Sequence, residues 1–124
     1  MQFEDTLLAD RAVVAVTGAD AESFLQGLVT DDVSAMRPGE ARYAALLTPQ
    51  GKMLFDFFVV WQPDGYWLDA ARVGLGSLIK RLKIYKLRAK VEVAELPEIR
   101  VSASALRGDI ADPRLADMGF RSYS

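Results

Sequence analysis

The chain has 124 residues, of which 51% are hydrophobic and 26% charged, and this balance is typical of one globular domain rather than a disordered or membranous chain. It contains no cysteine and no histidine, which excludes disulfides, thiolate metal sites, cysteine nucleophiles and imidazole bases. The net charge of −2 gives no overall attraction to nucleic acid or anionic lipid, so any anion-binding site has to rest on a local cluster of cations.

Strands and helices alternate along the first half of the chain. Residues 13–16 are a β-branched run that predicts a short strand. Asp20 is a good helix N-cap, and apolar residues at helical spacing after it predict a helix over roughly 21–29. Gly27 lies inside this predicted helix, where it indicates either the close approach of another group or a helix that ends early.

Three strands follow. Residues 41–48 and 53–62 predict a β-hairpin across a turn at the Pro-Gln-Gly-Lys segment, residues 49–52. Residues 66–70 come after another turn and continue the antiparallel series. We therefore expect a three-stranded meander.

A second helix and further strands complete the pattern. Apolar residues on one face predict an amphipathic helix over roughly 73–85, and residues 91–96 predict a strand that ends before Pro97. Another strand begins at Ile99, but the periodicity after it is weak. The element order predicts an α+β fold, in which helices cover one face of a mostly antiparallel sheet.

Asp56 most needs an explanation, because it lies inside the most apolar run of the chain, residues 53–61. Burying an unpaired carboxylate is costly. In strand phase its side chain shares a face with Phe58 and Val60. Either it pairs with a nearby Lys or Arg or lies at the sheet edge, or it faces a cavity, where it binds the polar edge of a heterocycle or acts as a general acid or base.

A cluster of cations occupies the second half of the second predicted helix and the residues just after it. Its members, six within eleven residues, are Lys80, Arg81, Lys83, Lys86, Arg88 and Lys90. Such a run can receive a polyanionic ligand tail, phosphate or nucleic acid, although a solvated helix face explains most of it. Arg88 and Lys90 are the better binding candidates, because they leave the predicted helix and enter the predicted strand.

Three segments closely resemble the amino-terminal part of the YgfZ-type folate-binding proteins, which are relatives of the glycine cleavage T-protein, an aminomethyltransferase. They are Phe24-Leu-Gln-Gly-Leu-Val-Thr-Asp-Asp-Val33, Tyr43-Ala-Ala-Leu-Leu-Thr-Pro-Gln-Gly-Lys-Met-Leu-Phe-Asp56 and Tyr85-Lys-Leu-Arg-Ala-Lys-Val91. The residues from Asp112 to Arg121 also resemble that family. The resemblance covers nearly all of the chain in the same order and spacing.

The resemblance implies a domain that helps to enclose tetrahydrofolate or a related reduced folate, in a longer protein that supports iron–sulfur cluster assembly or repair. It divides the chain into a folate-binding subdomain at 1–96 and the start of a second, truncated subdomain at 97–124. The first would be ferredoxin-like and similar to the first domain of the tRNA-modification GTPase TrmE. The family's cysteine motif has no counterpart here, so we expect an amino-terminal fragment that is not catalytic alone.

Residue by residue, the resemblance carries over five folate-site positions: Asp32, Tyr43, Asp56, Arg88 and Lys90. It implies no catalytic residue and no metal ligand in this chain. Asp56 matches an acidic position at the family's folate site. T-proteins usually have two aspartates there, and Phe55 replaces the first, which favours folate binding over aminomethyl transfer.

Two functions therefore remain in view. The first is a folate-binding scaffold for iron–sulfur protein maturation, with iron–sulfur client proteins as partners. The alternative is a folate-dependent aminomethyltransferase of the T-protein kind, with Asp56 as its essential carboxylate. By analogy with TrmE, whose similar domain pairs with a second copy, the fragment could form a homodimer.

The expected environment follows from what the chain lacks. Charged residues interrupt the amino-terminal region, so we expect it not to act as a secretory signal, and no run approaches the roughly 18 apolar residues of a membrane span. We therefore expect a cytoplasmic protein that contacts neither a membrane nor nucleic acid.

Overall fold

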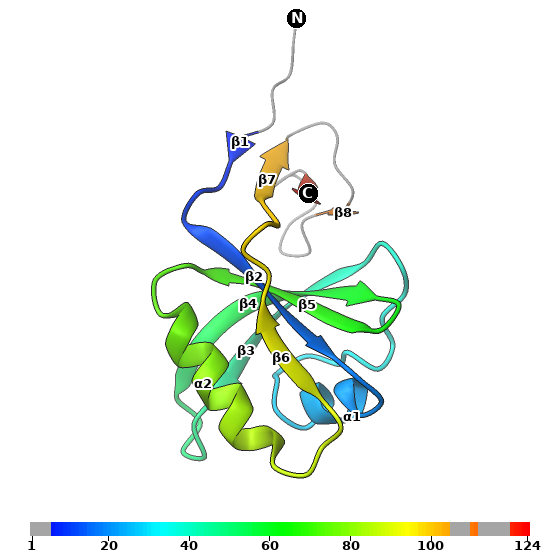
Figure 1. The fold of residues 1–124 in the computed structure, drawn as a ribbon, viewed down its shortest axis with the longest axis vertical. Coiled ribbons are helices and arrows are strands. Elements are labelled where there is room, and N and C mark those ends of the chain that lie inside the picture. Colours follow the sequence, from blue (N-terminus) through cyan, green and yellow to red (C-terminus); the bar gives the residue numbers. More distant parts are fainter. Residues whose placement is uncertain (1–5, 105–109, 112–119) are drawn as a thin grey trace, which may run out of the picture.

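The computed structural model describes residues 6–104, 110–111 and 120–124. Its main body is a five-stranded antiparallel sheet with the strand order β3-β4-β5-β2-β6 (Figure 1). The strands are β2 (Arg11–Thr17), β3 (Ala41–Leu47), β4 (Met53–Gln62), β5 (Gly65–Ala71) and β6 (Glu92–Glu95). Neighbouring strands are antiparallel throughout, and β3, β4 and β5 form the predicted meander.

Two helices in the described part of the chain, α1 (Ala21–Gln26) and α2 (Leu75–Lys86), cover one face of this sheet. Leu25 of α1 and Leu78 and Leu82 of α2 are fully buried in a core that also contains residues of the strands, among them Val14, Phe57 and Leu68. Because side chains alternate across a strand, every second residue of β2 and β5, and of β4 from Phe55 to Trp61, enters this core or packs against it. The α+β architecture predicted from the sequence, with helices on one face of an antiparallel sheet, is confirmed.

The remaining residues of each strand point to the opposite face of the five-stranded sheet. We call this face the helix-free face. Cross-strand pairing aligns Tyr43 with Phe58, and Phe58 with Asp69. Arg11 lies on this face as well, in register with Ala71. This face therefore carries polar and aromatic side chains beside buried aliphatic ones such as Val13 and Val60.

A second, smaller sheet lies at the upper end of the molecule in Figure 1, with the strand order β1-β7-β9-β8. Its strands are β1 (Thr6–Leu7), β7 (Val101–Ser104), β9 (Phe120–Tyr123) and β8 (Ile110–Ala111). The sequence predicted only the strand at β7. Because β1 comes from the amino-terminal end, this sheet joins segments from both ends of the chain. The subdomain division at residue 97 stays a prediction.

The ends of several elements differ from the predicted ones. The helix expected over 21–29 ends at Gln26, with Gly27 as its C-cap, so the early ending is correct. Asp20 occupies the N-cap position, but its carboxylate accepts a hydrogen bond from the backbone N–H of Lys90 instead of capping the helix. In the sequence, Arg107-Gly108 indicates a break in the last predicted strand and Asp112-Pro113 a loop, and both positions fall outside the described residues.

No helix in the described ranges is long and apolar enough to cross a membrane.

Candidate functional site

Asp56 and Tyr43 form a pair on the helix-free face. Ala45 lies directly opposite Asp56 in the β3–β4 register, and Tyr43 is two residues further along the same strand. The Tyr43 hydroxyl donates a hydrogen bond to Oδ2 of Asp56. Asp56 is half-buried, and its Oδ1 accepts no hydrogen bond from any residue that the structure describes. The carboxylate thus has a tyrosine as partner, and not the Lys or Arg of one of the sequence-based alternatives, and keeps one oxygen available.

Aromatic stacking connects this pair to a buried ion pair. The ring of Tyr43 lies 5.4 Å from the ring of Phe58, centroid to centroid, and the guanidinium of Arg11 lies 5.7 Å from the Phe58 centroid. Arg11 Nε donates to Oδ1 of Asp69 at 2.8 Å, and its Nη2 donates to the Asp69 carbonyl oxygen at 2.7 Å. A continuous set of contacts therefore runs along the helix-free face from Asp56 to Asp69.

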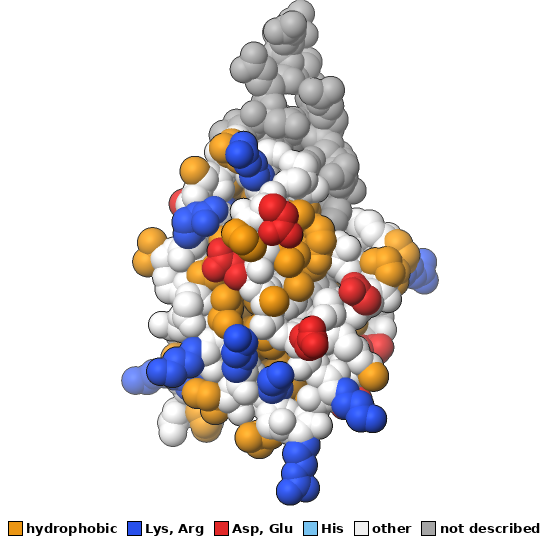
Figure 2. All heavy atoms as spheres, viewed as in Figure 1, with side chains coloured by type: hydrophobic (Ala, Val, Ile, Leu, Met, Phe, Trp, Pro, Cys, Tyr) orange, Lys and Arg blue, Asp and Glu red, His pale blue; other side chains and the backbone are white. Residues whose placement is uncertain are grey.

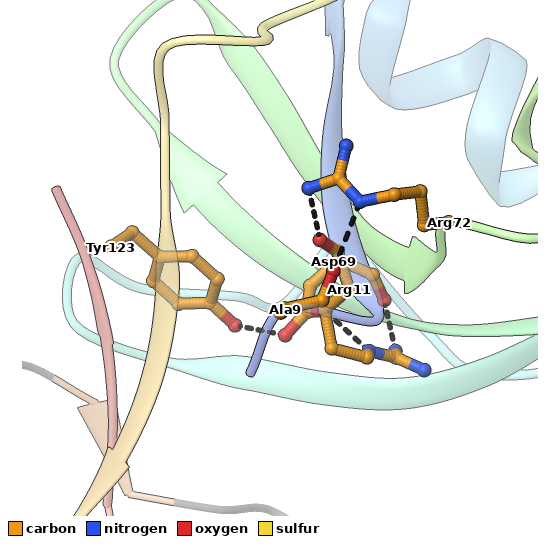
Figure 3. Close-up of polar contacts among 5 residues, drawn as sticks. All are labelled: Ala9, Arg11, Asp69, Arg72 and Tyr123. Carbon is orange, nitrogen blue, oxygen red and sulfur yellow. Dashed lines mark hydrogen bonds and ion pairs between the residues drawn. The ribbon is translucent and has the colours of Figure 1, made fainter. Parts of the chain in front are cut away.

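Asp69 is fully buried and is the one buried charged residue in the part of the chain that the structure describes. Its Oδ2 accepts a hydrogen bond of 2.8 Å from the hydroxyl of Tyr123, which comes from β9 of the small sheet (Figure 3). Arg72 secures the adjoining chain by donating to the carbonyl oxygens of Ala9 and Arg11. Asp69 is thus neutralised by a cation and linked to the small sheet.

Sequence reasoning missed Asp69. The signal was available, because an aspartate in the strand segment Tyr66-Trp-Leu-Asp-Ala70 presents the same energetic problem as Asp56. Its cation, Arg11, is far away in the sequence and becomes a neighbour only through the pairing of β2 with β5.

Asp32 lies in the loop after α1, away from the helix-free face. Its Oδ1 accepts hydrogen bonds from both the hydroxyl and the backbone N–H of Ser34. Both bonds lower the pKa of Asp32 below its ordinary value of 3.8, and the bond from the hydroxyl has the larger effect. Gln26 holds the same loop through its side-chain oxygen, which accepts from the N–H of Val33 at 2.8 Å. The local role of Asp32 is to shape an exposed loop.

Ser34→Ala should raise the pKa of Asp32 towards 3.8, because the hydroxyl hydrogen bond that favours the charged form is lost. A lowered pKa in the folded state gives stability that is present above pH 3.8 and is lost as the pH falls through the folded value. The variant should lose less stability over that acid range. An NMR titration of the Asp32 carboxyl carbon checks this, and identical midpoints in the two proteins would contradict it.

Arg88 and Lys90 lie in the loop between α2 and β6, so the prediction that they enter a strand is wrong: β6 begins only at Glu92. The helix ends where Leu87 adopts a positive φ of 40°, and the backbone N–H of Lys90 is then held by Asp20. Both cations are exposed. Figure 2 shows Lys and Arg side chains spread over α2 and the loop that follows it.

An open cleft of about 930 Å³ lies beside Lys90, at the end of β2. The segment Thr17–Ala19, the β4–β5 hairpin and the loop before β6 form its walls. Tyr66 lines it and is buried, which raises the pKa of its hydroxyl; that hydroxyl donates to the Val33 carbonyl at 3.1 Å. The structure therefore brings Tyr43 and Asp56 together on the helix-free face but places Asp32, Arg88 and Lys90 elsewhere.

Phe55 points to the opposite side of β4 from Asp56 and packs against the core beneath the helices. Its ring would lie 4.0 Å from a Cβ added at Gly74, just before α2. A carboxylate at position 55 would therefore project toward the core. The presence of Phe55 in place of an aspartate therefore removes no acidic group from the face that carries Asp56.

The fold and the surface together define a small antiparallel α+β domain with a polar and aromatic site on its helix-free face. The chain belongs to the family described as the GCVT N-terminal domain, whose model matches residues 10–109. A crystal structure of glycine cleavage system aminomethyltransferase T from Bartonella henselae has the same fold, with a TM-score of 0.72 and 21% identity over 81% of this chain and 28% of that one. Family membership predicted from the sequence is confirmed.

Curated relatives are named as iron–sulfur cluster assembly factors. The mitochondrial IBA57 homologs of Coccidioides immitis and Mycosarcoma maydis are 37% and 40% identical over 73% and 69% of this chain. The mitochondrial IBA57 of Mus musculus is 33% identical over 92% of it. The chain spans only 25% of the two fungal proteins and 41% of the mouse protein.

The cytoplasmic location expected from the sequence is contradicted by these relatives, which are named as mitochondrial. That expectation rested on the charged residues that interrupt the first apolar segments and on the lack of a long apolar run. Neither feature bears on import into mitochondria, because the segments that direct it are amphipathic and rich in arginine.

Proposed function

We propose that this chain is the reduced-folate-binding, amino-terminal part of a protein that assists iron–sulfur cluster assembly. The observation that carries the assembly role is the similarity, across most of the chain, to relatives named as iron–sulfur cluster assembly factors. Iron–sulfur proteins are the corresponding partners. Because the chain spans less than half of each of those relatives, the activity of the whole protein belongs to the proposal.

The Tyr43–Asp56 pair fits a reduced folate chemically. A tetrahydropterin ring presents several N–H donors, and Oδ1 of Asp56 is an acceptor that the described residues leave available. Tyr43 is 41% exposed, so its ring offers a flat apolar surface next to that acceptor. Asp32, Arg88 and Lys90 stay predicted folate contacts, and from their positions they would act only on parts of a ligand that extend away from this pair.

The proposal extends to the type of subdomain and to its pairing with a second copy. The units β2-α1-β3 and β5-α2-β6 each place a helix on the same side of the sheet, which supports a ferredoxin-like, TrmE-like folate subdomain with one additional strand. A homodimer of the fragment belongs to this analogy. Sedimentation equilibrium of the purified chain measures it directly.

Folate binding is tested by calorimetric titration with 5-formyltetrahydrofolate. Asp56→Asn should weaken binding about tenfold, because it replaces a charged acceptor by a neutral amide while the Tyr43 hydroxyl keeps an acceptor. Asp64→Asn is the matched control, since Asp64 is an exposed carboxylate that lines the separate cleft. Loss of binding with Asp64→Asn but not with Asp56→Asn would move the site to the cleft.

The alternative, aminomethyl transfer, is supported only by the fold shared with aminomethyltransferase T. The two functions separate when Asp56→Asn is introduced into the gene in its own cells. We expect lower activity of iron–sulfur enzymes and unchanged glycine cleavage. The reverse pattern would favour the transferase.

A further inference from the structure

Arg11 and Asp56 lie in one row across three strands of the helix-free face. Arg11 pairs with Ala71, and the register that pairs Phe57 with Ala70 places Asp56 on the other side of Ala71. Two strand spacings separate the Cα atoms of Arg11 and Asp56 by about 10 Å. Ala71, which is exposed, contributes only a methyl group between them. Arg11, whose side chain only donates hydrogen bonds, and Asp56, whose carboxylate only accepts them, thus lie on either side of the small side chain of Ala71.

The guanidinium of Arg11 is held in a fixed orientation, yet only part of it is used. Nε and Nη2 both donate to Asp69. Nη1 donates to no residue in the described ranges, and in Figure 3 it is the guanidinium nitrogen without a dashed line. The side chain keeps 19% of its surface exposed. Because the Asp69 contacts and the Phe58 ring restrain the group, its third nitrogen is pre-organised for an acceptor.

We propose that Arg11 is a ligand-binding residue that receives the carboxylate tail of the folate through Nη1. This inference rests on the proposed folate site, in which Asp56 accepts an N–H group from the heterocycle. A reduced folate has N–H donors on its ring system and carboxylates on its glutamate tail. Asp56 supplies an acceptor for the N–H groups of the ring system, and Arg11 supplies a cation for the carboxylates of the tail.

A purely structural role explains less of what is observed. Neutralising the buried carboxylate of Asp69 needs one cationic donor, which a lysine would also supply. Arginine provides two further donor nitrogens, and only one of these is used, on the Asp69 carbonyl. The remaining donor lies on the same face as Asp56, where the ligand proposal gives it a partner.

Arg11→Lys separates the two roles, because lysine retains the charge for Asp69 but has no second nitrogen for a ligand. Two ligands are titrated by calorimetry: 5-formyltetrahydrofolate, and 6-methyltetrahydropterin, which lacks the benzoylglutamate tail. We expect the variant to bind the folate about tenfold more weakly and the tailless pterin as well as the unmodified chain does. Arg72→Lys is the control, since Arg72 donates only to backbone carbonyl oxygens nearby.

The possible outcomes keep this inference distinct from the proposed function. Equal weakening for both ligands in Arg11→Lys, or no weakening for either, would overturn the assignment of Arg11 and leave folate binding standing. If the unmodified chain binds neither ligand, the proposed folate site itself fails. A selective loss for the tailed ligand that also occurs in Arg72→Lys would show that the effect comes from the local backbone, and would likewise overturn the assignment.

Discussion

Arg11→Met should lower the free energy of unfolding by about 3–5 kcal/mol, because it leaves the carboxylate of Asp69 buried without its cation. Asp69 is 0% exposed, so water cannot replace the lost partner unless the surrounding strands open. The hydroxyl of Tyr123 still donates to Oδ2, but a neutral donor does not compensate for a missing charge. Urea unfolding followed by circular dichroism measures the loss.

Two controls isolate the buried charge. Arg42→Met removes a cation from a partly exposed pair with Glu40, at 3.4 Å, and should change stability by less than about 1 kcal/mol. The double variant Arg11→Met with Asp69→Leu should recover much of the loss, because it removes the uncompensated charge as well. Similar effects of Arg11→Met and Arg42→Met would contradict the account of Asp69 as a charge that depends on Arg11.

Gly65→Ala should destabilise the chain by about 3 kcal/mol, combining backbone strain with overpacking. Gly65 begins β5 opposite Thr17 with φ of +155°, a conformation that residues with a side chain rarely adopt. An added Cβ would overlap the carbonyl oxygen of Val16 and lie 2.8 Å from the Cα of Thr17. Since both obstacles are backbone atoms, β2 and β5 would have to separate at this end. Thermal unfolding compared with the unmodified chain measures the change.

Gly76→Ala is the matched control for this substitution. Gly76 lies in the first turns of α2, and an added Cβ there would meet no atom within 4 Å. Alanine should therefore stabilise the helix by about 1 kcal/mol, because glycine loses more conformational freedom on folding. If both substitutions change stability to the same small extent, the close approach of the strands at Gly65 is not what selects glycine there.

The five-stranded sheet and its helices could be predicted because their signals are local. Alternation over 53–62 and a strong turn at 49–52 define the hairpin, and apolar spacing defines α2. The same alternation placed Asp56 on the face of Phe58, and the hairpin places Tyr43 beside it. This part of the site is therefore encoded within one pair of neighbouring strands.

The parts of the fold and of the site that were not predicted depend on pairings between segments that are distant in the sequence. The strand β1 has two residues and joins β7 from the far end of the chain, so no local pattern reveals it. The ion pair between Arg11 and Asp69 joins residues 58 positions apart. Gln26 and Asp20, which matched the family pattern or a helix cap, turn out to stabilise loops through backbone N–H groups. Spacing alone does not distinguish such loop contacts from ligand contacts.

The central claim is that a reduced folate binds on the helix-free face at Asp56. Mapping the backbone amide shifts of the isotope-labelled chain during titration with 5-formyltetrahydrofolate tests it most directly. The account predicts saturable shifts concentrated at 43–45 and 56–58, with a second group at Arg11 and Ala71. Shifts confined to the cleft around Thr17–Ala19 and Lys90, or no saturable shifts at all, would contradict it.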